Sequence, residues 1–182
     1  LVRHSDSRID RQQLAVFVNS YQRVAPLTIG ELWAWPSMLK LALIENLRRL
    51  AAETLASRRA RLAADAYVTR VERENPDVTR PLPPALGIAS VVQLLHRLRE
   101  YGLRLSSIRT AVEERLVSQE TTAEAAIRSE HQRQAADQVS VANAITSLRL
   151  CSALDWRQYV ESVSLVEHVL QNRREVEVDV VA

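Results

Sequence analysis

The sequence is poor in glycine, cysteine, lysine and aromatic residues. Three glycines against six prolines are few for a β-rich protein, whose tight turns depend on glycine. The single cysteine, Cys151, excludes a disulfide within the chain. Its apolar surroundings predict a small buried side chain, and a reducing compartment fits this composition. These scarcities disfavour a β-sheet protein and exclude a fold held together by disulfides.

Long hydrophobic runs are also missing. The densest run, from Met38 to Ile44, is interrupted by Lys40, whereas a membrane-spanning helix needs about 20 apolar residues. No signal peptide opens the chain, which begins at Leu1 and not at Met. We therefore expect a soluble piece of a longer protein. Its lack of membrane segments says nothing about that parent.

Charge is abundant but balanced. Lys40 is the one lysine among 24 basic residues, and arginine favours bidentate contacts with phosphate. However, 22 acidic residues are interspersed and the net charge is only +2, so a solvated helical surface explains the arginines better. The arginines around Arg58, Arg59 and Arg61 have few aromatic neighbours. We do not expect the chain to bind nucleic acid.

The sequence motifs of common active sites are absent. There is no glycine-rich phosphate loop, no HExxH or Cys/His metal pattern and no GxSxG. The four histidines, at positions 4, 96, 131 and 168, are far apart. Closely spaced Asp-x-Asp carboxylates, which hold a metal against a nucleotide-sugar diphosphate, are missing, as is Gln-x-x-Arg-Trp. We predict no catalytic, cofactor-binding or metal-binding residue in this chain.

Apolar residues recur at helical spacing along most of the chain. Leu39, Leu43, Leu47 and Leu50 form one such stripe, which Leu55, Leu62 and Val71 continue more sparsely. The pattern predicts an all-α fold without a sheet. We expect an antiparallel helical bundle with two long helices, at about 37–74 and 123–153, and several shorter ones.

The boundaries of the bundle follow from composition. Residues 1–8 are polar, and we expect a disordered N-terminal end. A single helical domain is predicted from 9 to 170, with a proline-rich linker at about 76–84. Residues 171–182 read differently from the rest, and we expect an atypical, flexible C-terminal end.

The richest segment lies between Pro26 and Ala51. It reads PLTIGELWAWPSMLKLALIENLRRLA, and Thr28 with Glu31 forms a capping-box pattern that starts a helix. Pro36 either kinks this helix or lies in the first turn of the next one. The segment also supplies a candidate interaction surface, made by Trp33, Trp35, Glu45, Asn46, Arg48 and Arg49.

Each of these candidate residues has a structural alternative. Trp33 and Trp35 could stack on sugar rings or anchor the helical core near the proline. The charged cluster from Glu45 to Arg49 could be a polar site or a solvated face with an internal ion pair. Asn46 and Asn143 are poor residues for a helix interior, and an asparagine between packed helices can fix their register.

Two segments carry a resemblance to a known family. The first runs from Pro26 to Ala51, and the second, from Asp137 to Leu170, reads DQVSVANAITSLRLCSALDWRQYVESVSLVEHVL. Both resemble the N-terminal helical region of the bacterial cyclic β-1,2-glucan synthases, upstream of the glycosyltransferase domain. Trp35 departs from the aliphatic residue expected there, and the residues after Leu170 depart from the family's continuation.

The resemblance implies a large inner-membrane glycosyltransferase as the parent. Such enzymes polymerise glucose from UDP-glucose, with a divalent metal implied, and then trim and cyclise the β-1,2-glucan. This segment would lie on the cytoplasmic side of the inner membrane, with the rest of the synthase as its partner. The catalytic motifs of the family lie elsewhere, so we expect a non-catalytic domain that scaffolds or regulates the glucosyltransferase. Whether the chain alone counts as an enzyme stays open.

Two other functions stay open from the sequence. The chain could be a self-association module that makes a homodimer through its first long helix. It could also bind a carbohydrate or nucleotide sugar through Trp33, Trp35 and Arg48.

Overall fold

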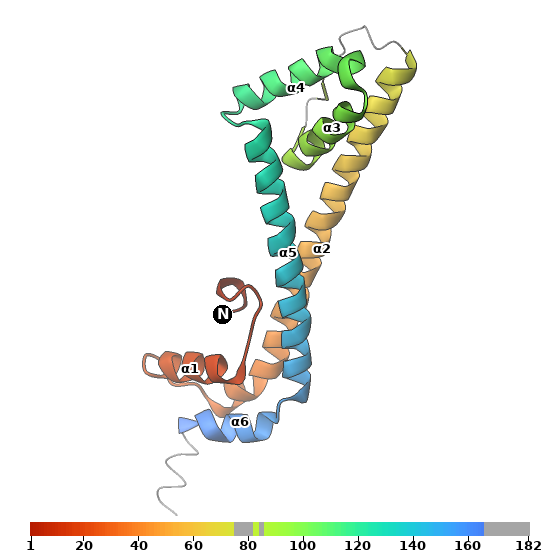
Figure 1. Ribbon diagram of the computed structural model, residues 1–182. Helices are drawn as coiled ribbons and strands as arrows, with labels where there is room; N and C mark the ends of the chain where they lie inside the picture. The colour runs from red at the N-terminus through yellow and green to blue at the C-terminus, as the bar shows by residue number, and fades with distance from the viewer. Residues whose placement is uncertain (75–81, 84–85, 166–182) are drawn as a thin grey trace, which may run out of the picture. The chain divides into compact units, whose positions relative to one another are not determined.

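The computed structural model describes residues 1–74, 82, 83 and 86–165 (Figure 1). These residues form helices, and no strand occurs among them, which confirms the all-α prediction. The α-helices are α1 (Arg11–Gln22), α2 (Ile29–Glu74), α3 (Ile88–Glu100), α4 (Ser106–Ser118), α5 (Ala123–Ala153) and α6 (Trp156–Val163). Two 3₁₀ helices, η1 (Val2–His4) and η2 (Gly102–Leu105), complete the set.

The two long helices are α2 and α5. The bounds of α5 agree with the prediction, whereas α2 begins at Ile29, before the predicted start at 37. The capping box explains the earlier start, because the Thr28 backbone N–H donates to Glu31 Oε2 at 2.7 Å and the Glu31 N–H donates to Thr28 Oγ1 at 3.3 Å. Pro36 then lies inside the helix, where it offers no N–H to the carbonyl one turn earlier.

Side chains and a glycine set several of the other helix ends. Asp10 and Asp155 cap α1 and α6, since their carboxylates accept from the backbone N–H groups of residues 13 and 158. Thr122 caps α5 by accepting from the Ala125 N–H at 3.2 Å. Gly102, with φ of +55°, follows α3 in the left-handed conformation that a helix C-terminus favours.

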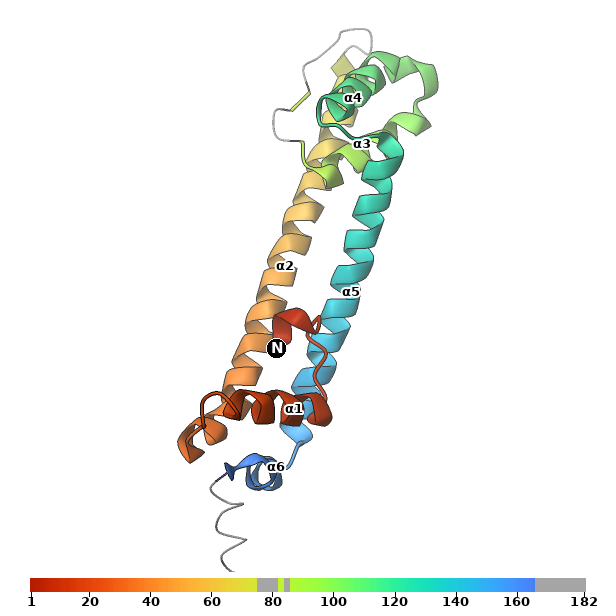
Figure 2. The same cartoon turned by 90° about the vertical axis from the view of Figure 1, so that its left-hand side faces the viewer.

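The chain divides into two compact units. Unit 1 contains Leu1–Arg48 and the residues from Val139 onward, and unit 2 contains Arg49–Gln138. Both α2 and α5 contribute one stretch to each unit, and within each unit these stretches run in opposite directions (Figures 1 and 2). The single domain predicted from 9 to 170 stays a prediction, because two compact units that share helices do not decide how many domains the chain has.

Unit 1 has a core between α1, α6 and its stretches of α2 and α5. Eleven residues are buried in it: Ile9, Leu14, Val18, Leu32, Leu39, Leu43, Ala144, Cys151, Tyr159, Val160 and Val163. Burial confirms the expected environment of Cys151, and the same burial raises the pKa of its thiol. The N-terminal residues 1–8, expected to be disordered, contain η1, and Ser7 is fully buried.

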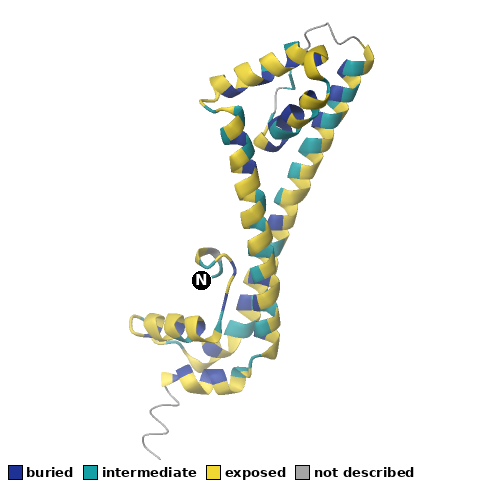
Figure 3. Cartoon of the chain, in the orientation of Figure 1, coloured by how far each residue is buried: buried dark blue, intermediate teal, exposed yellow. Residues whose placement is uncertain are grey.

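Unit 2 has a separate core, in which α3 and α4 pack with the remaining stretches of α2 and α5. Its members are Ala64, Val68, Val71, Val91, Leu94, Leu95, Leu98, Leu105, Ile108, Val112, Leu116 and Ala126. Leu55 and Leu62 are exposed, although they continue the apolar spacing of α2. Figure 3 shows buried residues recurring at intervals along the helices, between exposed ones.

Two predicted segments, the linker and the C-terminal end, are not tested by the structure. Most of the predicted linker at 76–84 and all of the predicted C-terminal end at 171–182 lie outside the described residues.

Candidate functional site

The main candidate site is an apolar groove in unit 1, between α1 and the first turns of α2. It has a volume of about 650 Å³. The residues that line it are Leu1, Val2, Phe17, Tyr21, Leu27, Glu31, Ala34, Trp35, Met38, Leu39 and Ala42. Glu31 is the only charged side chain among these lining residues, so a ligand would meet an almost wholly apolar surface.

The helix geometry produces this groove. Met38 lies three or four residues after Trp35 and Ala34 and four before Ala42, so these residues share one side of α2. Phe17 lies against this side. The centroid of its ring is 5.7 Å from the ring centroid of Trp35, in an edge-to-face arrangement. The small side chains of the two alanines leave space between the larger ones.

The groove is open and not sealed by side chains of unit 1. Met38 is 63% exposed, Tyr21 49% and Phe17 38%. Aromatic residues and methionine are enriched in protein interfaces, and methionine adapts to irregular surfaces. An apolar surface of this composition is suited to packing against another protein segment.

Glu31 marks the polar edge of the groove. Hydrogen bonds from the backbone N–H and the hydroxyl of Thr28 hold the pKa of its carboxyl below the usual value. The carboxylate therefore stays charged at neutral pH while it caps α2.

The six predicted surface residues do not form one site. Trp35 lines the groove, whereas Trp33 is 48% exposed and is not among the lining residues. Glu45 and Arg48 form an exposed ion pair on α2, with Arg48 Nη2 2.6 Å from Glu45 Oε1. Arg49 belongs to unit 2, where its Nη1 lies 2.8 Å from Glu53 Oε1. Their role as an interaction surface stays a prediction.

Asn46 contacts the N-terminal segment. Its Nδ2 donates to Ser7 Oγ at 2.6 Å, and Asn143 Nδ2 on α5 donates to the backbone oxygen of Asp6 at 3.2 Å. The sequence had singled out both asparagines as unusual inside a helix. Each binds the turn that precedes α1.

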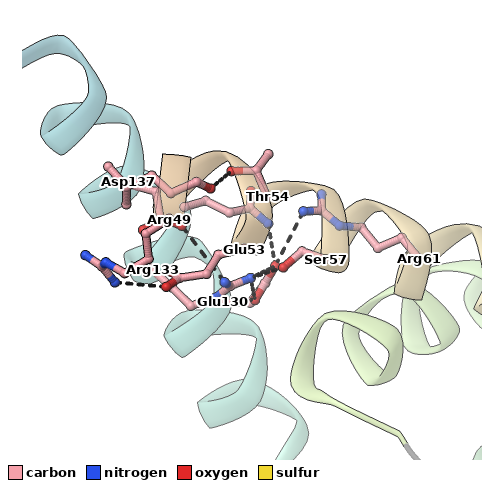
Figure 4. Close-up of polar contacts among 10 residues, drawn as sticks. Arg49, Glu53, Thr54, Ser57, Arg61, Glu130, Arg133 and Asp137 are labelled. Atoms are coloured by element: carbon pink, nitrogen blue, oxygen red, sulfur yellow. Dashed lines mark hydrogen bonds and ion pairs between the residues drawn. The ribbon is translucent and has the colours of Figure 1, made fainter. Parts of the chain in front are cut away.

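A polar cluster around Glu130 was not predicted as a site. The side chain of Glu130 is only 3% exposed, yet Arg133 Nη2 approaches it at 3.0 Å and Arg61 Nη2 at 3.7 Å (Figure 4). Gln134 Nε2 donates to it at 2.8 Å, and Arg133 also donates to Ser57 Oγ at 2.7 Å. The polar run from Glu130 to Gln134 was visible in the sequence, but its spacing alone does not distinguish a buried carboxylate from a surface one.

The cluster ties α2 to α5 inside unit 2. A buried carboxylate is costly unless charged partners and hydrogen bonds compensate for its lost hydration. Here two guanidinium groups and an amide supply that compensation. Because the groups pair closely with one another, the arrangement is that of a structural network.

Neither a cluster of metal ligands nor a membrane-spanning helix occurs among the described residues. Within residues 1–74, 82, 83 and 86–165, no group of three or more His, Cys, Asp or Glu side chains lies close enough to hold a metal ion. In the same ranges, no helix combines the length and the apolar character that crossing a bilayer requires.

The chain is similar over most of its length to a segment of a known protein. The sequence is 35% identical over 176 residues to the cyclic beta-(1,2)-glucan synthase NdvB of Rhizobium meliloti (strain 1021). The predicted resemblance to the cyclic β-1,2-glucan synthases is confirmed. The alignment covers 93% of this chain but only 6% of the synthase, so the chain is similar to one segment of a far longer protein. No family model matches the sequence.

Proposed function

We propose that the chain is a non-catalytic helical domain of a cyclic β-1,2-glucan synthase, which scaffolds or regulates the part that transfers glucose from UDP-glucose. Its apolar groove would receive another segment of the same synthase. The observation that carries the proposal is this open groove, in a chain that is similar to 6% of a synthase. The remaining length of such a synthase supplies segments that could cover the groove.

The setting of this domain is part of the proposal. We place it on the cytoplasmic side of the bacterial inner membrane, next to the glucosyltransferase. The transferase would bind UDP-glucose and a divalent metal with its own residues. The sequence of the chain contains neither Asp-x-Asp nor Gln-x-x-Arg-Trp, and its contribution would be to assembly.

The groove can be tested by placing a charge in it. In a synthase that carries this chain, Met38→Glu should lower the yield of cyclic glucan at least about tenfold, because a buried charge at the centre of an interface costs more than about 1.4 kcal/mol. Yield and the membrane level of the synthase are measured together. The fold of the domain should survive, since Met38 is 63% exposed.

Leu62→Glu is the matched control. Leu62 is on the same helix and 58% exposed, but it belongs to unit 2 and does not line the groove. Equal losses from both variants, or no loss from Met38→Glu, would overturn the groove as the docking surface. Unchanged yield after deletion of residues 26–170 would remove the scaffolding role itself.

The two alternative functions give different outcomes. A self-association module would sediment as a dimer at high concentration, and Met38→Glu would then convert it to a monomer. A nucleotide-sugar module would change its tryptophan fluorescence on titration with millimolar UDP-glucose. In the structure Arg48 is already paired with Glu45, which favours the scaffolding role over the nucleotide-sugar role.

A further inference from the structure

The N-terminal segment Leu1–Ser7, here called the strap, is held in an unfavourable backbone conformation. Asp6 and Ser7 have φ values of 47° and 64°, in the left-handed region that residues with a Cβ rarely adopt. Such residues persist only where surrounding contacts determine their conformation, and they are common in switch segments. The contacts of the strap therefore indicate its role.

Side chains of α2 and α5 supply these contacts. Ser147 Oγ donates to the backbone oxygen of Ser7 at 2.6 Å and accepts from the Ile9 N–H at 2.9 Å. Asn46 Nδ2 donates to Ser7 Oγ at 2.6 Å, and Asn143 Nδ2 donates to the Asp6 oxygen at 3.2 Å. Ser7 and Ser147 are at most 1% exposed. Three of these hydrogen bonds hold Asp6 and Ser7, and the fourth holds the Ile9 N–H two residues later. We call this set of four the latch.

Residues of the strap also line two hollows of unit 1. One is the apolar groove, which Leu1 and Val2 help to line. The other, of about 670 Å³, lies along the N-terminal half of α1, and Leu1, His4 and Ser5 help to line it. Leu1 and Phe17 line both hollows. Figures 1 and 2 show η1 on the same side of α2 and α5 as α1, as this position requires.

We propose that the strap is a releasable cover and that the latch sets how often it opens. When it opens, Leu1 and Val2 leave their places, and the two hollows join into one apolar surface along α1, from Val16 to Tyr21. In the closed state, the strap therefore covers part of a longer groove. This property belongs to the chain itself and goes beyond the proposed function, which needs only the groove that is already open.

Hydrogen exchange of the 182-residue chain measures the opening. Asn46→Ala removes a bond to the Ser7 side chain and none to the backbone N–H groups of Ser7 and Ile9. Both amides are bonded in the closed strap, Ser7 to the Val2 oxygen at 2.9 Å and Ile9 to Ser147. We expect their exchange to become about tenfold faster. Exposed Asn19 on α1 supplies the control Asn19→Ala, which should leave both rates unchanged.

A variant with the opposite effect guards against simple misfolding. Asp6→Gly keeps the backbone oxygen that Asn143 binds and removes the steric cost of a positive φ. Its Ser7 and Ile9 amides should exchange about threefold more slowly than those of the parent chain. Faster exchange in Asp6→Gly would overturn the strain argument.

Binding of an apolar fluorescent dye, anilinonaphthalene sulfonate, tests what the strap covers. Dye binding should rise in Asn46→Ala and fall in Asp6→Gly, while amides of α3 in unit 2 keep their exchange rates. If the Ser7 and Ile9 amides of Asn46→Ala exchange at the parent rate, the latch does not hold the strap. If they exchange faster but dye binding stays constant, the strap does not cover an apolar surface. Either result would overturn the proposal.

Discussion

Units 1 and 2 differ in how polar groups connect their helices. In unit 1 the connections are neutral: Asn46 to Ser7, Ser147 to Ile9, and Gln22 Nε2 to the Val163 oxygen at 2.8 Å. In unit 2 the neutral contact from Ser90 Oγ to the Ala60 oxygen at 3.2 Å is accompanied by charged ones, with Glu130 between Arg61 and Arg133 and with Arg97 Nε 3.5 Å from Asp65 on α2. Among the described residues, the charged contacts between helices therefore distinguish unit 2 from unit 1.

The aromatic residues show the same asymmetry. Six of the eight, Phe17, Tyr21, Trp33, Trp35, Trp156 and Tyr159, belong to unit 1. A neutral hydrogen bond contributes about 1 kcal/mol net to stability, so little free energy is lost when it breaks. A buried carboxylate that loses its partners destabilises the fold by about 3–5 kcal/mol. Unit 1 thus combines an open aromatic surface with contacts that can exchange. Unit 2 has a charge network that joins α2 to α5.

The largest effect is expected from the charge network of unit 2. Arg61→Met combined with Arg133→Met leaves the Glu130 carboxylate, 3% exposed, without its two guanidinium partners. We expect unit 2 to lose about 3–5 kcal/mol of unfolding free energy, measured by urea denaturation. Adding Glu130→Leu to this pair should restore most of the loss, since the buried charge is then gone.

The matched control is a charge pair on the surface of unit 1. Arg157 and Glu161 lie 3.0 Å apart, and the Arg157 side chain is 81% exposed. Arg157→Met should cost less than about 1 kcal/mol. A similar small loss in the Arg61 and Arg133 double variant would contradict the difference that we draw between the units.

The sequence predicted the helices because their signals are local. Spacing and caps such as Asp10 and Asp155 lie within a few residues of the element that they define. It misplaced the start of α2 because Pro36 suggested a break, although the capping box at Thr28 had already started the helix. It could not show that Leu55 and Leu62 are exposed, since helical spacing shows which residues share a face but not which face a neighbouring helix covers.

The candidate site was less predictable for a physical reason. Trp35 was marked, but the groove also needs Phe17, Tyr21 and Leu1, which reach it from other elements. The burial of Glu130 depends on Arg61, which is 69 positions earlier in the chain. Contacts over such distances leave no periodic trace in a single sequence.

A second, smaller effect is expected in unit 1 at high pH. Burial raises the pKa of Tyr159 to about 12, whereas an unfolded tyrosine ionises near pH 10. Between these values the unfolded chain releases the phenol proton first, so the free energy of unfolding falls as the pH rises. The fall attributable to Tyr159 should reach about 2–3 kcal/mol by pH 12.

Tyr159→Phe isolates this contribution. Among the described residues the Tyr159 hydroxyl has no hydrogen-bond partner. At pH 7 the free energy of unfolding of the variant should therefore lie within about 1 kcal/mol of that of the parent chain. Above pH 10 it should lose less stability than the parent. Parallel pH profiles for the two chains would contradict the assigned burial of the phenol.

The smallest effect is expected at the helix caps, where the two units should behave alike. Thr28 caps α2 in unit 1, and its hydroxyl accepts from a backbone N–H at 3.3 Å. Thr122 caps α5 in unit 2, and its hydroxyl accepts from a backbone N–H at 3.2 Å. Replacing either by alanine should cost about 1 kcal/mol in urea denaturation, and serine should preserve the cap. Caps act within one helical turn. Equal losses of stability in the two alanine variants would therefore indicate that the units differ in their contacts between helices and not in their helix ends. Losses that differ by more than about 1 kcal/mol would place part of that difference in the helix ends.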